Sequence, residues 1–307
     1  MDLDTLRTFV LAVQLRSLTA AARAVARSQP AVSLQIQRLE REAGDRLLVR
    51  QARGVRPTPA GEILYARAQG ILRATDELLA ELRASGALER GSLRIGATDV
   101  MAITFLPRVL ARFRERYPGI RTAVEVEGSR GLARRVANGE LDLALVTLPI
   151  EQTELQVREV DREPMRFVAA PDHPLTRRRA TLAQLAAEPM IQHQGASVTR
   201  QEVSAVFRVH GLEPRVAMEV SSPEAIKELV ALGLGIAPLS RSQIARECAQ
   251  GKLVALRAPD FRCWRRSGVA TRADLLPRRV VRAFLEGLPG GRSAANGQGN
   301  PRDSAKG

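Results

Sequence analysis

Residues 17–40, SLTAAARAVARSQPAVSLQIQRLE, narrow the folds open to this chain more than any other segment. Their apolar positions recur at helical spacing in two short blocks, which predicts two helices joined by a tight turn. The inner face of the first helix is small and apolar, at Leu18, Ala21, Ala22 and Val25. The inner stripe of the second consists of Val32, Ile36 and Leu39. Ser28 can cap the second helix, and Pro30 falls in its first turn, where a missing N–H is tolerated.

The outward face of the second helix carries side chains suited to DNA. A helix pair of this kind places its second helix in the major groove, where Gln, Ser and Arg reach base edges or phosphates. The predicted contact residues on this helix are Ser28, Gln29, Pro30, Ala31, Ser33, Gln37 and Arg38. Every helical hairpin has an inner stripe and often a capping Ser, so a purely structural hairpin stays as the alternative.

Residues 44–59, GDRLLVRQARGVRPTP, are predicted to form a two-stranded ribbon with its turn at Gly54. Arg50, Arg53 and Arg56 bracket that turn and would lie against the sugar–phosphate backbone. An amphipathic helix over residues 3–13 can pack on the hairpin, so residues 1–59 are predicted to be a winged helix-turn-helix domain. A solvated, charged loop is the alternative for the ribbon.

Residues 60–88 are predicted to form one long helix, because they contain no proline and their apolar residues alternate at four- and three-residue steps. The residues of this seam are Leu64, Ala68, Ile71, Thr75, Leu78 and Leu82. The helix would be about 40 Å long at 1.5 Å per residue. We expect it to link the domains and to dimerise; a helix lying on its own domain is the alternative.

From Gly91 onward, short apolar segments alternate with amphipathic ones, which predicts parallel sheets with helices on both faces. Strands are expected near 93–96, 122–126, 141–146, 165–170, 216–220, 235–238 and 268–271. Helices are expected near 105–117, 131–138, 198–210, 223–232 and 278–288. Residues 89–288 would form two lobes, lobe I from about 91–161 plus 268–288 and lobe II from about 162–267. The polar, glycine-rich residues 289–307 are predicted to be a disordered tail.

Composition excludes several classes of protein. The most apolar stretch, Val230–Leu239, is far shorter than the roughly 18 residues of a membrane span, and the start of the chain lacks a signal segment, so we expect a cytoplasmic protein. The net charge of +14 suits nucleic acid, although it could also serve solubility. Cys248, Cys263 and the three histidines lack metal-ligand spacing, so we expect no metal and no cofactor. The two cysteines are expected to be inert thiols, with a redox pair as the alternative.

The order and spacing of several motifs resemble the LysR-type transcriptional regulators, from Met1 to about Leu288. The motifs are LRTF at 6–9, SLTAAA at 17–22, SQPAVS at 28–33, RLE at 38–40, TPAG at 58–61, GELDLA at 139–144 and VALGLGI at 230–236. Two positions depart from the pattern. Leu34 stands where many members have Arg, and Pro57 stands where Leu is more usual, which predicts a short second strand in the wing.

The resemblance implies an N-terminal, all-α winged helix-turn-helix domain and a long linker helix. It implies a C-terminal, two-lobed α/β domain similar to periplasmic binding proteins. The implied partners are double-stranded DNA carrying an interrupted inverted repeat, a small-molecule effector, further copies of the chain in a homodimer or homotetramer, and RNA polymerase.

Open α/β sheets bind ligands at the carboxyl ends of their strands, where helix N-termini point. In this chain the rule nominates Thr98, Asp99, Ser129, Thr147, Ser197, Thr199, Ser221 and Ser222. Hydroxyls and free N–H groups suit a small anion such as an organic acid. Asp99 would repel a carboxylate, so either it caps its helix or the effector carries a cationic group, as an amino acid does. Ser and Thr are also ordinary helix caps, which is the structural alternative.

Enzyme signatures are incomplete. Residues 195–199, GASVT, match only half of a nucleophile elbow, and residues 86–92, GALERGS, lack the lysine of a phosphate loop. No catalytic residue is therefore predicted. The alternatives to a sequence-specific regulator are a nonspecific DNA-binding protein, a solute-binding protein, and an enzyme with an appended DNA-binding domain.

Overall fold

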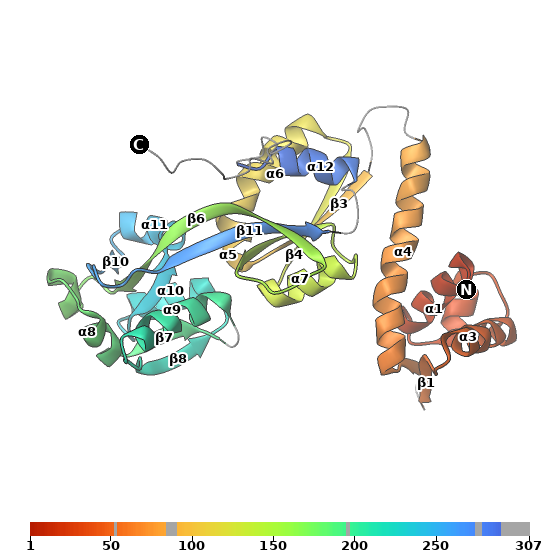
Figure 1. The fold of residues 1–307 in the computed structure, drawn as a ribbon, viewed down its shortest axis with the longest axis horizontal. Coiled ribbons are helices and arrows are strands. Elements are labelled where there is room, and N and C mark those ends of the chain that lie inside the picture. The colour runs from red at the N-terminus through yellow and green to blue at the C-terminus, as the bar shows by residue number, and fades with distance from the viewer. Residues whose placement is uncertain (52–53, 84–90, 195–196, 274–277, 290–307) are drawn as a thin grey trace, which may run out of the picture.

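The computed structural model describes residues 1–51, 54–83, 91–194, 197–273 and 278–289. Along its longest axis, a small helical domain is followed by one long helix, α4 (Pro59–Arg83), and then by two α/β lobes (Figure 1). The predicted fold class is confirmed. Within the predicted long helix, residues 84–88 lie outside the described part of the chain, as do residues 290–307 of the predicted tail.

The small domain is a helix-turn-helix unit with a two-stranded wing. Its elements are α1 (Leu3–Gln14), α2 (Leu18–Ala24), α3 (Gln29–Ala43), β1 (Leu48–Gln51) and β2 (Gly54–Pro57). A side-chain oxygen caps each helix, because Asp2, Ser17 and Ser28 accept bonds from backbone N–H groups three residues on. Phe9 and Val32 are fully buried where α1 and α3 meet, so the core is built on the predicted stripes.

The wing depends on a glycine at its turn. Gly54 has φ +108°, and a Cβ there would lie 2.1 Å from the carbonyl oxygen of Arg16. Val55 donates its N–H to that same oxygen at 3.0 Å, which ties the wing to the end of α1. Pro57 does not shorten the second strand as expected, because Pro57 pairs with Leu48 and β2 has four residues, as β1 does.

Helix α4 packs one apolar face on the small domain. Ala68 and Leu72 are buried in the same core as Phe9, so this face of the helix lies on its own domain, which was the alternative to the expected dimerisation helix. Other large apolar side chains of α4 remain exposed, namely Ile63, Ile71, Leu78 and Leu79. The helix therefore carries a second apolar face that nothing in the described chain covers.

Lobe I is built on parallel strands. It contains β3 (Gly91–Ala97), α5 (Asp99–Thr104), α6 (Leu106–Arg116), β4 (Ile120–Val126), α7 (Ser129–Ala137), β5 (Leu143–Leu148) and the returning helix α12 (Arg279–Glu286). Strand β3 pairs in parallel with both β4 and β5. Phe113 and Phe284 meet edge to face, 5.4 Å between centroids, and hold α6 against α12.

Lobe II has a small parallel sheet of its own. Its elements are η1 (Pro174–Arg177), α8 (Leu182–Ala187), β7 (Met190–His193), α9 (Val198–Val209), β8 (Val216–Val220), α10 (Pro223–Ala231), β9 (Ala237–Ser240), α11 (Arg241–Ala249) and β10 (Val254–Ala255). Strands β7 and β8 are parallel. Phe167, Phe207 and Phe261 form the aromatic centre of this lobe's core.

Two long strands join the lobes and correct the prediction of purely parallel sheets. Strands β6 (Leu155–Ala169) and β11 (Trp264–Arg272) pair antiparallel with each other along the length of β11. Strand β11 also pairs antiparallel with β5 in lobe I, and β6 pairs antiparallel with β9 and β10 in lobe II. The pair therefore runs from one lobe to the other as a shared hinge (Figure 1).

The hinge contains a buried ion pair on its lobe II side. Arg265 on β11 contacts the Glu163 carboxylate on β6, and both residues are at most 5% exposed. Glu163 also accepts hydrogen bonds of 2.8 Å from the N–H and the hydroxyl of Ser242, in the first turn of α11. One carboxylate thus connects both hinge strands to a lobe II helix.

Candidate functional site

A cavity lies where the two lobes meet. Its volume is about 110 Å³, and it is lined by Thr98, Asp99, Val100, Glu127, Gly128, Ser129, Thr147, His193, Ser197, Val198, Thr199, Pro223, Ile226, Pro238, Leu239 and Gln243. An adjoining cavity of about 180 Å³ shares Val100, Pro223 and Gln243 with it. Small-ligand sites are more often 300–1,000 Å³. A molecule of a few heavy atoms fits here as the lobes stand, and a larger one requires them to part.

Three helices begin at this cavity without a capping side chain. They are α5 and α7 in lobe I and α9 in lobe II, preceded by Thr98, Gly128 and Ser197. The first backbone N–H groups of a helix have no partner within the helix and carry partial positive charge. Because both lobes direct such groups at one space, the cavity is suited to an anion.

The structure brings six of the eight nominated residues to this cavity. They are Thr98, Asp99, Ser129, Thr147, Ser197 and Thr199. It does not bring Ser221 and Ser222 there: Ser221 is exposed, and the Ser222 hydroxyl caps α10 by accepting a bond from the N–H of Ala225. The neighbouring Pro223 lines the cavity in their place.

The polar groups of the cavity differ in whether they have a hydrogen-bond partner within the protein. The Ser129 hydroxyl accepts a bond of 3.0 Å from the N–H of Thr147, so it partly holds the lobe together. The hydroxyl oxygen of Thr98 is buried and has no hydrogen-bond partner in the described structure, which leaves it for a ligand. Asp99 is exposed in the first turn of α5, and Glu127 adds a second carboxylate.

Sequence reasoning missed Glu127, His193 and Gln243 as lining residues. His193 ends β7, a strand of four residues that was not predicted. Gln243 lies in α11, also not predicted, and its side chain accepts the N–H of Ser240 at 2.9 Å. The sequence SRSQ at 240–243 has the spacing of a capping box and could have identified the start of that helix.

The predicted DNA-contacting side chains lie on the outward face of α3 and on the wing. Pro30, Ala31, Gln37 and Arg38 are exposed, while Gln29 and Ser33 are half-buried. Arg50 on β1 donates to the Ser33 hydroxyl at 2.9 Å, so the wing and α3 form one continuous polar surface. Arg56 is exposed on β2, and Arg53 lies outside the described residues.

Glu40 fixes the wing relative to α3. One of its carboxylate oxygens accepts the N–H groups of Leu47 and Leu48, at 2.9 and 3.1 Å. Ser28 is occupied as the cap of α3, with the N–H of Ala31 3.4 Å from its hydroxyl. Glu40 therefore positions the wing against α3, and the predicted contact residues Pro30, Ala31, Gln37 and Arg38 stay exposed on the outward face of the helix.

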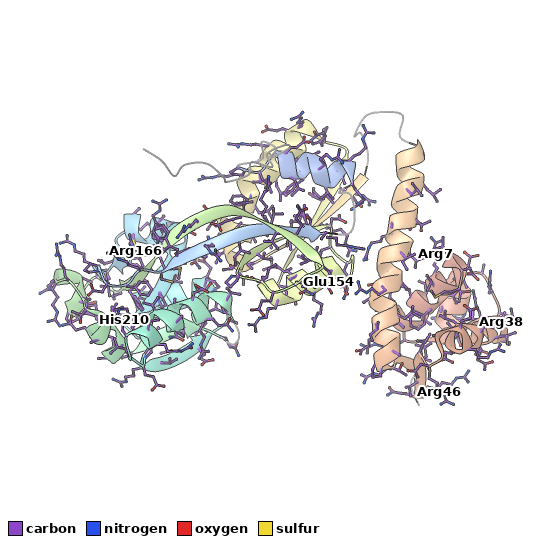
Figure 2. The ribbon with its side chains drawn as sticks, viewed as in Figure 1. Arg7, Arg38, Arg46, Glu154, Arg166 and His210 are labelled. Carbon is purple, nitrogen blue, oxygen red and sulfur yellow. The ribbon has the colours of Figure 1, made fainter. Side chains whose placement is uncertain are left out.

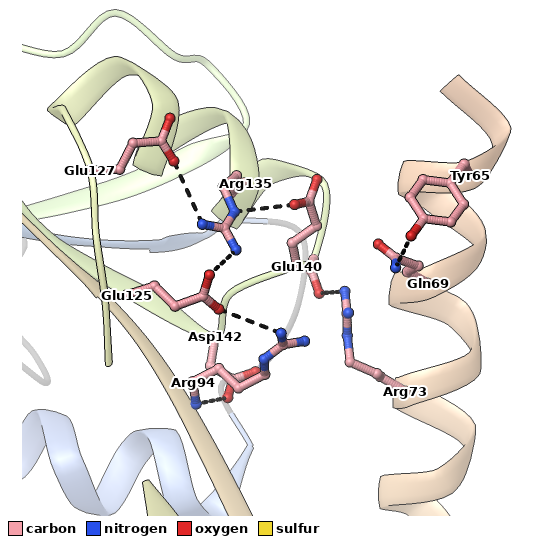
Figure 3. A network of polar contacts seen from close by, with 10 residues as sticks. Tyr65, Gln69, Arg73, Arg94, Glu125, Glu127, Arg135, Glu140 and Asp142 are labelled. Carbon is pink, nitrogen blue, oxygen red and sulfur yellow. Dashed lines mark hydrogen bonds and ion pairs between the residues drawn. The ribbon is translucent and has the colours of Figure 1, made fainter. Parts of the chain in front are cut away.

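Helix α4 contacts the two-lobed α/β domain at one turn of lobe I. Arg67 donates to the carbonyl of Ala137 at 3.0 Å, and Arg73 donates to that of Gly139 (Figure 3). Between them, Gly70 lies so close that a Cβ there would sit 2.9 Å from the carbonyl oxygen of Asn138. The turn after α7 is therefore packed directly on α4.

An ion-pair network connects that turn to the cavity. Arg135 on α7 contacts the carboxylates of Glu125 at 2.5 Å, Glu140 at 3.2 Å and Glu127 at 3.6 Å (Figure 3). The hydrogen bond from Arg135 lowers the pKa of Glu125, against the effect of burial. Because Glu127 lines the cavity and Glu140 lies in the turn on α4, one guanidinium connects the two regions.

Other chemistries find little support in the described part of the chain. No cluster of three His, Cys, Asp or Glu side chains is placed to hold a metal ion there. Burial raises the pKa of the Cys263 thiol to about 11 and also raises that of Cys248, which disfavours the reactive thiolate. Among the described helices, none combines the length and apolar character needed to cross a bilayer.

Two family models match the chain. One, described as bacterial regulatory helix-turn-helix protein, lysR family, matches residues 3–62, and the other, described as LysR substrate binding domain, matches residues 86–290. The RuBisCO operon transcriptional regulator of Allochromatium vinosum is 35% identical over 271 residues, covering 86% of this chain and 88% of that protein. The regulator CbbR of Xanthobacter flavus is 34% identical, with coverage of 94% and 91%.

Solved structures show the same architecture. Full-length OxyR from Pseudomonas aeruginosa, a single-residue variant, aligns with a TM-score of 0.73 over 94% of this chain and 97% of that one, at 24% identity. The CcmR regulatory domain of Synechocystis, solved in complex with 2-PG, aligns with a TM-score of 0.60 at 32% identity. That alignment covers 64% of this chain and 95% of the regulatory domain.

Proposed function

This chain belongs to the LysR family of bacterial transcriptional regulators, and from that premise we propose which of its residues contact DNA, hold the effector and connect the two. It is a sequence-specific DNA-binding regulator that responds to a small molecule bound between the lobes of its C-terminal domain. Its relatives are transcriptional regulators, and the proposal contains no catalytic step.

The effector that we propose is a small organic acid or an amino acid. The observation that carries this proposal is the convergence of three uncapped helix N-termini on one cavity, which favours a carboxylate or phosphate. Asp99 and Glu127 give an amine a position in the same space, and the complex of the CcmR domain with 2-PG supports a small-molecule ligand in this type of domain.

A thermal-shift screen of the full-length chain against organic acids and amino acids tests this proposal. An effector at a hundred times its dissociation constant should add about 2.7 kcal/mol to the free energy of unfolding. Thr199→Val removes a lining hydroxyl at nearly constant volume and should weaken the effector about tenfold, the effect of one lost hydrogen bond. Thr153→Val, in an exposed turn, is the matched control. Equal stabilisation of wild type and Thr199→Val by every acid would contradict the assignment of the cavity.

We propose that α3 enters the major groove, with Gln29, Pro30, Ala31 and Ser33 near the bases and with Arg38, Arg50 and Arg56 near phosphates. Gln29→Ala should weaken operator binding by roughly 1–3 kcal/mol and leave binding to random DNA nearly unchanged. Ser33→Arg should weaken operator binding to a similar extent, because it removes the hydroxyl that accepts the bond from Arg50 and places a long side chain where Ser33 faces the bases. Fluorescence anisotropy with operator and scrambled duplexes measures both, and Gln250→Ala, exposed in lobe II, is the control. Unchanged operator affinity in both variants would exclude α3 as the reading helix.

The exposed second face of α4 supports association of two copies through this helix. Pairing would place two α3 helices for two halves of an interrupted inverted repeat. We also propose that the chain forms a dimer or a tetramer, that it contacts RNA polymerase and that it is located in the cytoplasm. Effector binding would then change how the paired domains bend or span DNA.

The signal from effector to DNA is proposed to pass through α7. This helix begins at the cavity with Ser129 and ends in the turn on which α4 lies. A shift of α7 along its axis would move that turn, and Arg135 would move the Glu127 and Glu140 carboxylates with it. A rigid helix with a ligand at one end and another domain at the other is a physical route for coupling.

A further inference from the structure

Lobe II carries a second concave surface that shares no lining residue with the interlobe cavity. It is an open cleft of about 850 Å³ bounded by strand β6, strand β10 and residues 255–264. That volume lies within the usual range for small-molecule sites. Four arginines line it, namely Arg166, Arg179, Arg257 and Arg262.

The four guanidinium groups have no acidic partner among the described residues. All four side chains are exposed, and none takes part in the ion pairs found across residues 1–51, 54–83, 91–194, 197–273 and 278–289. The described lining includes no Asp or Glu. Arg179 and Arg257 are also neighbours across a backbone bridge, in which Ala180 donates to the carbonyl of Arg257 at 2.8 Å. The two side chains therefore start from adjacent backbone positions, and an anion bound between their guanidinium groups would be attracted by both.

An aromatic residue completes the cleft. Trp264 lines it and is 47% exposed, while the guanidinium carbon of Arg162 lies 5.1 Å from its ring centroid. Phe261, almost fully buried, provides an apolar floor. Arginine forks match phosphate and carboxylate groups with two parallel hydrogen bonds. We propose that this cleft is a second ligand site, which binds a small polyanion carrying several phosphate or carboxylate groups.

The position of the cleft favours a small ligand over DNA. Arg166 lies in lobe II at the opposite end of the molecule from Arg38 and Arg46 of the helix-turn-helix domain (Figure 2). The cleft is therefore not part of the surface that α3 and the wing present. A surface that binds the sugar–phosphate backbone of DNA does not have to be concave, whereas this surface is concave and has an apolar floor.

The chain contains a single tryptophan, so tryptophan fluorescence reports on the surroundings of Trp264, which lines this cleft. The full-length protein is titrated with inorganic tripolyphosphate and, separately, with citrate at constant ionic strength, with excitation selective for tryptophan over the two tyrosines. We expect a saturable change in emission for at least one of the two. The anion that binds more tightly identifies phosphate or carboxylate as the preferred group.

Arg179→Gln combined with Arg257→Gln should weaken the tighter anion at least tenfold. The control is Arg108→Gln combined with Arg112→Gln, two exposed arginines on α6 of lobe I, which should bind as wild type does. Thr199→Val should also bind as wild type does, which separates this site from the effector cavity. The absence of a saturable response to either anion, or an equal response in both double variants, would overturn the proposal.

Discussion

Replacing Glu163 with Gln is expected to lower the free energy of unfolding by about 3–5 kcal/mol, because it leaves the buried Arg265 guanidinium without its counter-charge. Two nitrogens of Arg265, Nε and Nη1, already lack a hydrogen-bond partner within the described structure. The substitution also weakens the cap of α11, since the amide has only one acceptor oxygen for the two groups of Ser242. Urea or thermal unfolding measures the loss.

Glu159→Gln is the matched control, because Glu159 lies on the same strand and pairs with Arg266 at the surface, 3.8 Å apart. Exposed pairs contribute about 0–1 kcal/mol, so this variant should unfold nearly as wild type does. The double variant Glu163→Met, Arg265→Met should recover much of the stability, since no unpaired charge remains. If Glu163→Gln proved as mild as Glu159→Gln, the ion pair would not hold the hinge.

The difference between wild type and Glu163→Gln should also depend on pH. Burial opposes ionisation of Glu163, but Arg265 and the bonds from Ser242 outweigh it, so the folded-state pKa lies below the ordinary value of 4.5. A lowered folded-state pKa stabilises the fold above the ordinary pKa, and the stabilisation is lost as the pH falls through the folded-state pKa. We expect the full difference at neutral pH and a smaller one in acid well below pH 4.5. Unfolding curves across that range test the sign.

Replacing both Arg67 and Arg73 should abolish the effect of effector binding on DNA binding. Both side chains bind backbone carbonyls of the turn after α7, and neither contacts the effector cavity or the outward face of α3. Arg67→Ala with Arg73→Ala should therefore bind effector and operator, each within a few fold of wild type. Allosteric coupling typically changes the affinity for the second ligand 5–150-fold. In this variant, effector should cause almost no change in operator affinity or in the DNA bend.

Glu62→Ala provides the control on the same helix, since this residue is exposed in the first turn of α4. Gly70→Val tests the same contact by a different route, because its Cβ would meet the carbonyl of Asn138 and push the turn away. Anisotropy and DNA-bending measurements with and without effector give the coupling. Full coupling in both contact variants would show that the signal bypasses this turn.

The sequence predicted elements whose stabilising contacts are local. Helices α2 and α3 follow from their apolar spacing and from the Ser17 and Ser28 caps, and the structure has both. Strand β6 was predicted only from Met165, although it begins at Leu155. The missed half, LQVREVDREP, is rich in charge and gains its partners from Arg265 and Arg266, about a hundred residues later. Strand direction was wrong for β6 and β11 because periodicity carries no information on pairing.

The candidate site was predictable where one rule sufficed. Hydroxyl residues after a predicted strand lie at helix starts, and that rule located Thr98 and Ser129, while the predicted helix from residue 198 located Ser197. It failed for Ser222, whose hydroxyl is consumed by its own helix. The turn of lobe I that packs on α4 had no local signal, because a contact between Gly70 and Asn138 depends on how two domains dock.

The three uncapped helix starts belong to different lobes, with α5 and α7 in lobe I and α9 in lobe II. An anion long enough to contact all three helix starts would bridge the two lobes. Its full binding energy would be available only when the lobes are closed on it. A shorter analogue that satisfies the lobe I termini alone occupies the same space and leaves α9 unengaged. Such a molecule would compete with the effector without closing the lobes. Molecular length would then separate agonist from antagonist in this regulator.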